Sequence, residues 1–260
     1  MSSRTTSPRA ADGRNLVATL LCASALFAPL AVHSQPLSGD GYLFRRPAGS
    51  FTLRGGFTQP TASSDVFNDS RKFLTLDRGD FATGSVSGDI GVRIADRWQL
   101  QFNGGYSKRT IASEMRDWED NEGLPIEQTT SLTRLPFMVG MRFDLTQPGR
   151  RVSRLAYIPS KITPYVTGGA GIMWYSYRQA GSFVDFRSLD VFESTLTSKG
   201  TTGAAYGAIG ADFSVRPTLA ITTEFRYDMA RAPMNQQFFS GFNKIDLGGV
   251  NATIGLTFRY

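Results

Sequence analysis

The chain has 260 residues, of which 28 are Lys or Arg and 22 are Asp or Glu, with a mean hydropathy of −0.19. This length fits one large all-β domain or two average domains. The positive surplus of +6 is small and spread along the chain, so nucleic acid is not an expected partner.

The amino-terminal segment has the three parts of a secretory signal peptide. A positively charged start, an apolar run and a small residue follow one another: Arg4, Arg9, Arg14, Leu16–Val32 and Ser34. We expect residues 1–34 to be removed by cleavage near Ser34, which leaves a mature chain that begins at Gln35 or close to it. The apolar run is marginal in length for a spanning helix, so an uncleaved anchor is the alternative.

Cys22 and His33 are the only Cys and His of the chain, and both lie in the expected signal peptide. The mature protein would therefore have neither a thiol nor an imidazole. An acyl-transfer site would need a base with a pKa near the working pH, and a carboxylate or lysine would need a far-shifted pKa to replace a histidine. We expect no catalytic residues and no bound cofactor.

After an expected amino-terminal extension over residues 35–48, segments of alternating apolar and polar residues predict β-strands. The predicted strands cover residues 49–58, 83–95, 98–109, 130–144, 163–178, 202–215, 218–229 and 246–260. The alternation is clear where Trp98, Leu100 and Phe102 alternate with polar neighbours. Each strand would have one apolar face and one polar face.

The connections between these strands alternate between short and long. Short connections lie at Ala95–Arg97 and Arg216–Thr218, and long polar ones at 59–82, 110–129, 179–201 and 230–245. Outer-membrane barrels have short periplasmic turns and long outer loops, whereas a Greek-key sandwich would not alternate in this way. The sequence therefore predicts an all-β, eight-stranded antiparallel up-and-down transmembrane barrel over residues 49–260, with both ends of the mature chain in the periplasm.

One connection is too long for a periplasmic turn. Thr146–Thr163 carries several Arg and Lys residues. A tolerated insertion is one interpretation, because loop length costs little free energy. Contact with anionic lipid headgroups or with a periplasmic partner is the other.

Aromatic residues at the strand ends predict two girdles at the membrane boundaries. Beside the short connections lie Phe51, Trp98, Phe143, Tyr165, Phe213, Phe258 and Tyr260, and beside the long ones lie Phe57, Tyr106, Trp174, Tyr177 and Tyr227. The last strand would close the barrel, with its terminal rings in the periplasmic girdle.

The closing segment Thr253–Tyr260, TIGLTFRY, resembles the terminal signal read by the outer-membrane barrel assembly machinery. The matching residues are Thr253, Gly255, Phe258 and Tyr260. From about Gly49 onward, including the first hairpin Phe51–Asp69, the chain is similar to the small outer-membrane β-barrel domain proteins related to OmpA, OmpX and OmpW. This resemblance implies a monomer in a Gram-negative outer membrane, in contact with its lipids, lipopolysaccharide and the assembly machinery, and without the peptidoglycan-binding domain of OmpA-type proteins.

Charged residues on the polar faces of the strands would point into the barrel. They are Arg54, Asp89, Arg93, Arg134, Arg142, Asp212, Glu224 and Arg226. An eight-stranded barrel is just wide enough for side chains to fill, so we expect a packed ionic core and not a channel lining. In it, Glu224 is expected to balance Arg226 and its neighbours.

The outer segment Glu114–Glu127 concentrates carboxylates. Its candidate cation ligands are Asp117, Glu119, Asp120 and Glu122, although they lack the spacing of a calcium loop. The function we expect is a structural or surface-interaction role through the outer loops. The alternatives are a passive conduit or binding site for a small or hydrophobic molecule and, less favoured, a lipid-modifying enzyme.

Overall fold

The computed structural model describes residues 42–260 with the exception of 121, 154–155 and 186–189. The chain divides into two units, Met1–Gly39 and Asp40–Tyr260, and every described residue belongs to the second. The expected signal peptide, its cleavage near Ser34 and residues 35–41 of the expected extension therefore lie outside the described residues.

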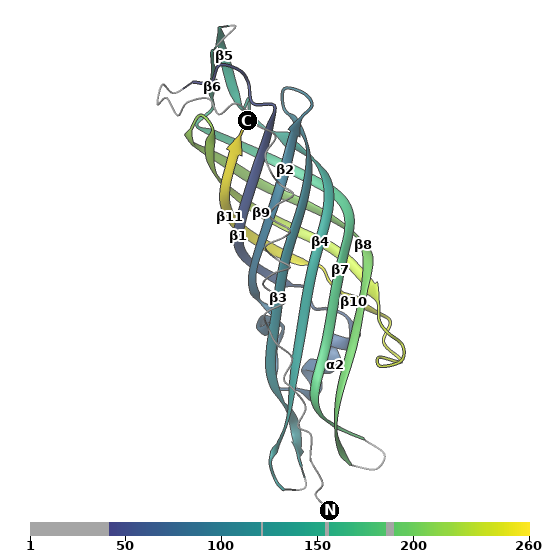
Figure 1. Cartoon of the computed structure of the whole chain (residues 1–260). Coiled ribbons are helices and arrows are strands. Elements are labelled where there is room, and N and C mark those ends of the chain that lie inside the picture. Colours follow the sequence, from purple (N-terminus) through teal and green to yellow (C-terminus); the bar gives the residue numbers. More distant parts are fainter. Residues whose placement is uncertain (1–41, 121, 154–155, 186–189) are drawn as a thin grey trace, which may run out of the picture. The chain divides into compact units, whose positions relative to one another are not determined.

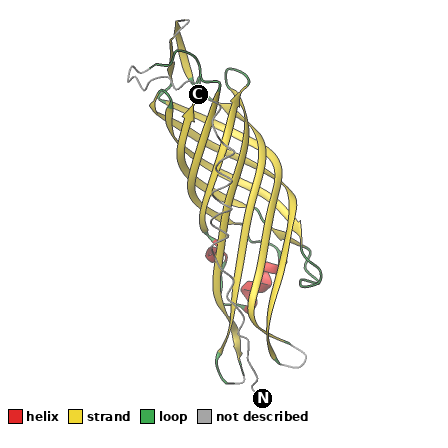
Figure 2. Ribbon diagram, in the orientation of Figure 1, coloured by secondary structure: helices red, strands yellow, loops and turns green. Residues whose placement is uncertain are grey.

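Eight strands form one closed antiparallel sheet (Figures 1 and 2). They are β1 (Gly49–Pro60), β2 (Thr83–Arg93), β3 (Trp98–Glu119), β4 (Pro125–Asp144), β7 (Ile162–Val184), β8 (Val191–Arg216), β9 (Leu219–Pro233) and β11 (Gly249–Arg259). Each strand pairs with the next one along the chain, and β11 also pairs with β1, which closes the ring. The predicted eight-stranded up-and-down barrel is confirmed.

The alternation of residue types decides which side of the sheet faces inward. In β3, Trp98 and Phe102 are 43% and 47% exposed, whereas Gln99 and Gln101 are each 4% exposed. Successive side chains of a strand point to opposite faces, so the apolar face lies outside and the polar face inside. This arrangement is the reverse of a soluble barrel and suits a lipid environment.

Four strands continue well past their predicted ends, and the prediction of loops at 110–129 and 179–201 is wrong. In the β3–β4 hairpin, β3 ends at Glu119 and β4 begins at Pro125. In the next hairpin, β7 ends at Val184 and β8 begins at Val191. Alternate residues Ile111 and Met115 are still buried, so the period of two persists where the outward residues have become polar. We call the end that carries these hairpins the loop end, and the opposite end the turn end.

The loop end contains an apolar core, although residues 59–82 were predicted as a polar loop. Helix α2 (Asp65–Phe73) and the 3₁₀ helix η2 (Arg78–Phe81) lie in this segment, and β10 (Lys244–Asp246) pairs with β9. The loop-end core includes the buried residues Val66, Phe67, Leu76, Phe81, Ile126, Tyr177, Phe239 and Leu247. The ring centre of Phe67 lies 5.0 Å from that of Phe81 and 5.7 Å from that of Tyr177. Among the described helices, none is both long enough and apolar enough to cross a membrane.

At the turn end, the long connection Thr146–Thr163 contains a second, two-stranded sheet. Its strands are β5 (Gly149–Ser153) and β6 (Ala156–Pro159). Leu43 and Tyr157 exchange two backbone hydrogen bonds of 2.8 Å. The chain before β1 is thereby attached to this hairpin.

Two of the predicted girdle residues point inward instead. Tyr165 and Tyr177 are 1% and 0% exposed, so their assignment to the girdles is wrong. The reason is strand parity, because Tyr165 shares its face with the buried Thr163 and Thr167. Exposed rings lie near the turn end at Phe51, Trp98, Phe213, Phe258 and Tyr260 and near the loop end at Phe57, Tyr106, Trp174 and Tyr227, while Phe143 is partly exposed.

Candidate functional site

The inner side of the barrel is occupied by a network of charged side chains, which we call the interior lattice. Its members are Arg54, Asp89, Arg93, Arg142, Asp144, Asp212, Glu224, Arg226, Asp228 and Arg259. The side chains of all ten are at most 14% exposed. Seven of the eight charged residues predicted to point inward belong to this lattice, and the eighth, Arg134, is buried beside it.

In the middle of the barrel, Arg54 is the shared cation of two carboxylates. Its Nη1 lies 2.7 Å from Oδ2 of Asp89, and its Nη2 lies 3.3 Å from Oε2 of Glu224. The expectation that Glu224 balances Arg226 is therefore corrected, because the ion-pair partner of Glu224 is Arg54. Arg54 reaches across β11 at Gly255, where an added Cβ would lie 2.6 Å from Cγ of Arg54.

Toward the turn end, Arg142 joins two strands through two carboxylates. Its Nε and Nη2 each lie 2.8 Å from an oxygen, of Asp144 and Asp212 respectively. Arg93 approaches Asp144 to 3.4 Å, and Arg259 approaches Asp212 to 3.6 Å. Each carboxylate therefore has two cationic neighbours.

Two tyrosines connect the charged groups along the barrel. The guanidinium of Arg142 lies over the Tyr165 ring, and the Tyr165 hydroxyl donates a hydrogen bond of 2.9 Å to Glu224. In the same manner, Arg226 lies 3.8 Å from the centre of the Tyr206 ring. A cation over a desolvated aromatic face is stabilised by the ring quadrupole, so these tyrosines are part of the charge balance.

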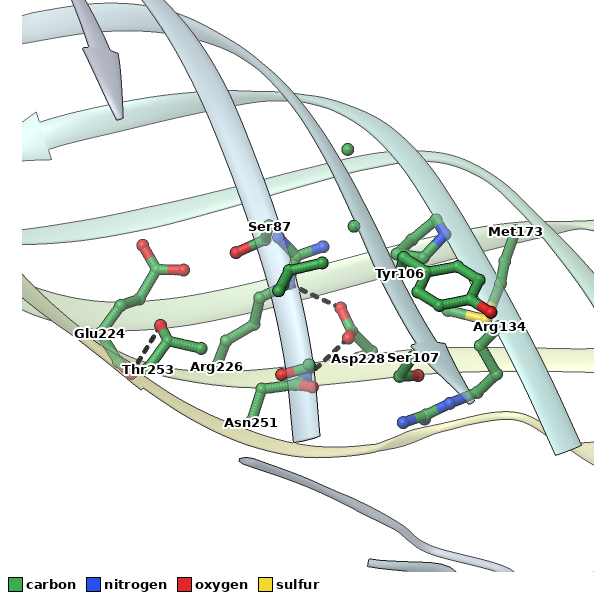
Figure 3. A pocket seen from close by; sticks show the side chains of 15 residues that line it. Ser87, Tyr106, Ser107, Arg134, Met173, Glu224, Arg226, Asp228, Asn251 and Thr253 are labelled. Carbon is green, nitrogen blue, oxygen red and sulfur yellow. Dashed lines mark hydrogen bonds and ion pairs between the residues drawn. The ribbon is translucent and has the colours of Figure 1, made fainter. Parts of the chain in front are cut away.

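Toward the loop end, the lattice finishes at Asp228 (Figure 3). Asp228 accepts hydrogen bonds of 2.7 Å from Nε of Arg226 and 2.8 Å from Nδ2 of Asn251. Arg134 makes no ion pair within the described part of the chain, and donates instead to Oγ1 of Thr58 at 2.5 Å and to the Leu247 carbonyl at 3.1 Å. It thereby ties the lattice region to the loop-end core.

Sequence reasoning missed five residues of this site, namely Asp144, Tyr165, Tyr206, Asp228 and Arg259. A signal was present for two of them. Asp144 and Asp228 each lie two positions after a predicted inward Arg, and residues two apart share a face of a strand.

The lattice leaves little free space. A cavity of about 40 Å³ is lined by Glu224, Arg226 and Asp228 among others (Figure 3), and one of about 20 Å³ lies beside Arg142 and Asp212. A buried water needs at least roughly 10–15 Å³ of such space. These two cavities therefore have room for single waters, and the charged side chains around them hold strands together.

The four candidate cation ligands lie around the tip of the β3–β4 hairpin. Oδ1 of Asp120 accepts hydrogen bonds from the backbone of Glu122 and Leu124, at 2.9 and 2.8 Å. This carboxylate thus stabilises the turn. Within the described residues, no group of three or more Asp, Glu, His or Cys side chains is placed to hold a metal ion.

The four residues of the terminal signal all lie at the closing seam. Thr253 and Gly255 belong to the β11 register with both β1 and β9. The Phe258 ring is 46% exposed on the outer side. The Tyr260 carbonyl accepts hydrogen bonds from the backbone of Ala48 and Gly49, at 2.7 and 3.0 Å, so the last residue fastens the start of β1.

A family model described as "Outer membrane protein beta-barrel domain" matches residues 18–258. Similar solved structures include OprG from Pseudomonas aeruginosa, with 16% identity, a TM-score of 0.47, and coverage of 84% of this chain and 99% of that one. Outer membrane protein W from E. coli has 15% identity, a TM-score of 0.39, and coverage of 83% and 100%. Neisserial surface protein A has 10% identity, a TM-score of 0.41, and coverage of 82% and 96%. No curated protein matches the chain.

Proposed function

Because the chain belongs to the outer membrane protein β-barrel domain family, we propose that it is a closed barrel that acts through its outer surface and conducts no solute. The family resemblance inferred from the sequence is thereby confirmed. In this proposal the barrel lies in the bacterial outer membrane with its turn end in the periplasm, because outer-membrane barrels have their short turns on that side.

The interior lattice is the observation that carries this proposal. Several of its ion pairs join different strands, as Arg54 of β1 does with Asp89 of β2 and Glu224 of β9. Breaking one partner of a buried ion pair costs on the order of 3–5 kcal/mol. A solute would have to break several such pairs in succession, which makes passage far slower than through an open pore.

The outer surface in this proposal is formed by the two long hairpins. At their tips, Leu124 and Phe192 are 59% and 48% exposed, and Phe192 stacks on Phe183 with ring centres 6.2 Å apart. Exposed carboxylates at Asp117 and Glu119 lie near the first tip. Hard divalent cations bind carboxylate oxygens, so these groups could share such cations with lipopolysaccharide phosphates.

Catalysis forms no part of the proposal. The described residues include neither His nor Cys, and the interior carboxylates and tyrosines are engaged with arginines. A general base needs access to a substrate proton, and the small interior cavities offer none.

Conductance in planar lipid bilayers tests the proposal. The wild-type protein should show no stepwise conductance, and neither should a Glu127→Gln control, which changes an exposed carboxylate on the β4 hairpin strand. Stepwise wild-type conductance whose ion selectivity changes in Glu224→Gln but not in Glu127→Gln would establish the conduit alternative. Transfer of an apolar dye into protein-containing vesicles, above the rate in protein-free ones, would do the same for a hydrophobic solute.

A further inference from the structure

The periplasmic end of the barrel carries exposed cations that the interior lattice does not use. We call them the basic collar: the exposed Arg45, Arg150, Arg151, Lys161 and Arg216, together with the partly exposed Arg97. They lie in segments 42–48, 94–97, 145–161 and 214–218, whose single carboxylate is Asp96. Asp96 is already paired with Arg46, and within the described residues no member of the collar makes an ion pair.

Tyr157, at the centre of this region, adds no negative charge. Burial raises the pKa of the Tyr157 hydroxyl, although the neighbouring Arg46, Arg93 and Arg259 act in the opposite direction. The hydroxyl therefore stays protonated at physiological pH. The four short segments that form the collar therefore carry a net positive charge.

The collar is held in place by the fold. Two backbone hydrogen bonds join Leu43 to Tyr157. The Arg46–Asp96 ion pair attaches the segment that contains Leu43 to the β2–β3 turn. At the base of the β5–β6 hairpin, Oγ of Ser160 donates to the Gln147 carbonyl at 2.6 Å. These contacts fix the described parts of the collar segments, so a ligand does not have to supply the entropy cost of ordering those parts.

The collar borders the outward aromatic rings of the turn end. Arg97 lies 4.5 Å from the centre of the Phe143 ring and directly precedes the exposed Trp98. Lys161 directly precedes Ile162, which is 55% exposed on the outer face. Aromatic girdles mark the level of the headgroups, so these two cations are at the depth where lipid phosphates lie.

Apolar side chains are exposed among the same cations. Val152 is 59% exposed and Phe44 is 48% exposed. Cations interspersed with exposed apolar groups are typical of membrane-surface segments, whereas a site for a soluble polyanion has no use for the apolar groups. We therefore propose that the basic collar binds the anionic headgroups of phospholipids in the periplasmic leaflet.

Quenching of Trp98 by brominated lipids tests this proposal. The protein carries Trp118→Phe and Trp174→Phe so that Trp98 is the only emitter, and it is reconstituted in phosphatidylcholine vesicles with phosphatidylglycerol. In one sample the phosphatidylcholine is brominated and in the other the phosphatidylglycerol, with the same mole fraction of brominated lipid in both. A basic residue near an anionic membrane contributes about 1 kcal/mol, or about fivefold. Quenching should therefore report an enrichment of phosphatidylglycerol near Trp98 of about fivefold or more, and high salt should reduce it.

Two matched variants each remove four positive charges, one from the collar and the other from the opposite end of the barrel. The collar variant is Arg150→Gln, Arg151→Gln, Lys161→Gln and Arg216→Gln, and the control is Lys108→Gln, Lys199→Gln, Arg231→Gln and Lys244→Gln, all exposed residues of the loop end. The enrichment should disappear in the collar variant and persist in the control. Heat-dependent gel migration should show that both variants are folded. Equal quenching by the two lipids in the unaltered collar would overturn the proposal, as would enrichment that survives loss of the collar. Binding of soluble polyphosphate without any lipid preference would assign the collar to a periplasmic polyanion instead.

Discussion

The guanidinium of Arg142 lies 3.7 Å from the centre of the Tyr165 ring, whose hydroxyl donates to Glu224 on another strand. Arg142 belongs to β4, Tyr165 to β7 and Glu224 to β9. One tyrosine thus joins the ion pairs of the turn end to those around Arg54. The interior lattice is consequently one connected network, and its parts should be coupled when they are measured.

Tyr165→Phe should destabilise the barrel through the loss of one hydrogen bond to a charged group. The expected cost is about 1.5–3 kcal/mol, because the ring remains under Arg142 while Glu224 loses a donor. Equilibrium urea unfolding in lipid vesicles measures the change. Tyr106→Phe is the control, since Tyr106 is 45% exposed on the outer face. Equal stability of both variants would contradict the role given to Tyr165.

Glu224→Gln and Arg54→Met should be strongly non-additive. Glu224→Gln leaves Arg54 with Asp89 as its carboxylate partner, whereas Arg54→Met leaves both Asp89 and Glu224 without this cation, at a cost on the order of 3–5 kcal/mol. In the double variant only Asp89 has lost its cation, so the double variant should lose clearly less stability than the sum of the two single changes. A second cycle with Glu224→Gln and Arg226→Met serves as the comparison, because the ion-pair partner of Arg226 is Asp228. A larger coupling energy in this second cycle would refute the partner assignment.

Phe67→Ala should loosen the loop-end core and leave the barrel itself closed. Phe67 is 0% exposed, and truncating a buried Phe costs about 3–5 kcal/mol. Limited proteolysis should cut within residues 61–82 faster than in the wild type. Phe57→Ala, at a ring that is 74% exposed, is the control. Loss of heat-dependent gel migration in Phe67→Ala would mean that the core supports the whole barrel.

Gly255→Ala should impair closure of the barrel. An added Cβ would lie 2.0 Å from the Leu53 carbonyl oxygen, which is a backbone atom that cannot move away without breaking the β1–β11 pairing. Gly207→Ala in β8 is the control, because an added Cβ there meets nothing within 4 Å. The measurement is the folded fraction after refolding into detergent micelles. Refolding without the assembly machinery separates this packing effect from recognition of the terminal signal.

The strands were predictable from sequence because lipid and interior impose opposite residue types on their two faces. This signal fades where a strand leaves the membrane. Beyond Arg109 most outward residues of β3 are polar, namely Thr110, Glu114 and Arg116, so the pattern resembles a loop although Ile111 and Met115 still point inward. The strand ends could not be read from composition for that reason.

Inward placement of charge was predictable, but pairing was not. Glu224 and Arg226 are two residues apart and share a face, which made them plausible partners. The actual partner, Arg54, lies across β11, and its level relative to Glu224 depends on the stagger of the strands around the barrel. That stagger is a property of the closed sheet and is not encoded in any one strand.

Arg54 lies in the first barrel strand and Glu224 in the seventh, 170 residues later. A contact between such distant residues has to wait for the loop between them to close. Until β11 joins β1, Arg54 and Glu224 are held on an open sheet, and their charges are stable there only in contact with water. On an assembly route in which β11 docks last, the inner face stays hydrated until the barrel closes. Dehydration of the lattice is then the final event of assembly.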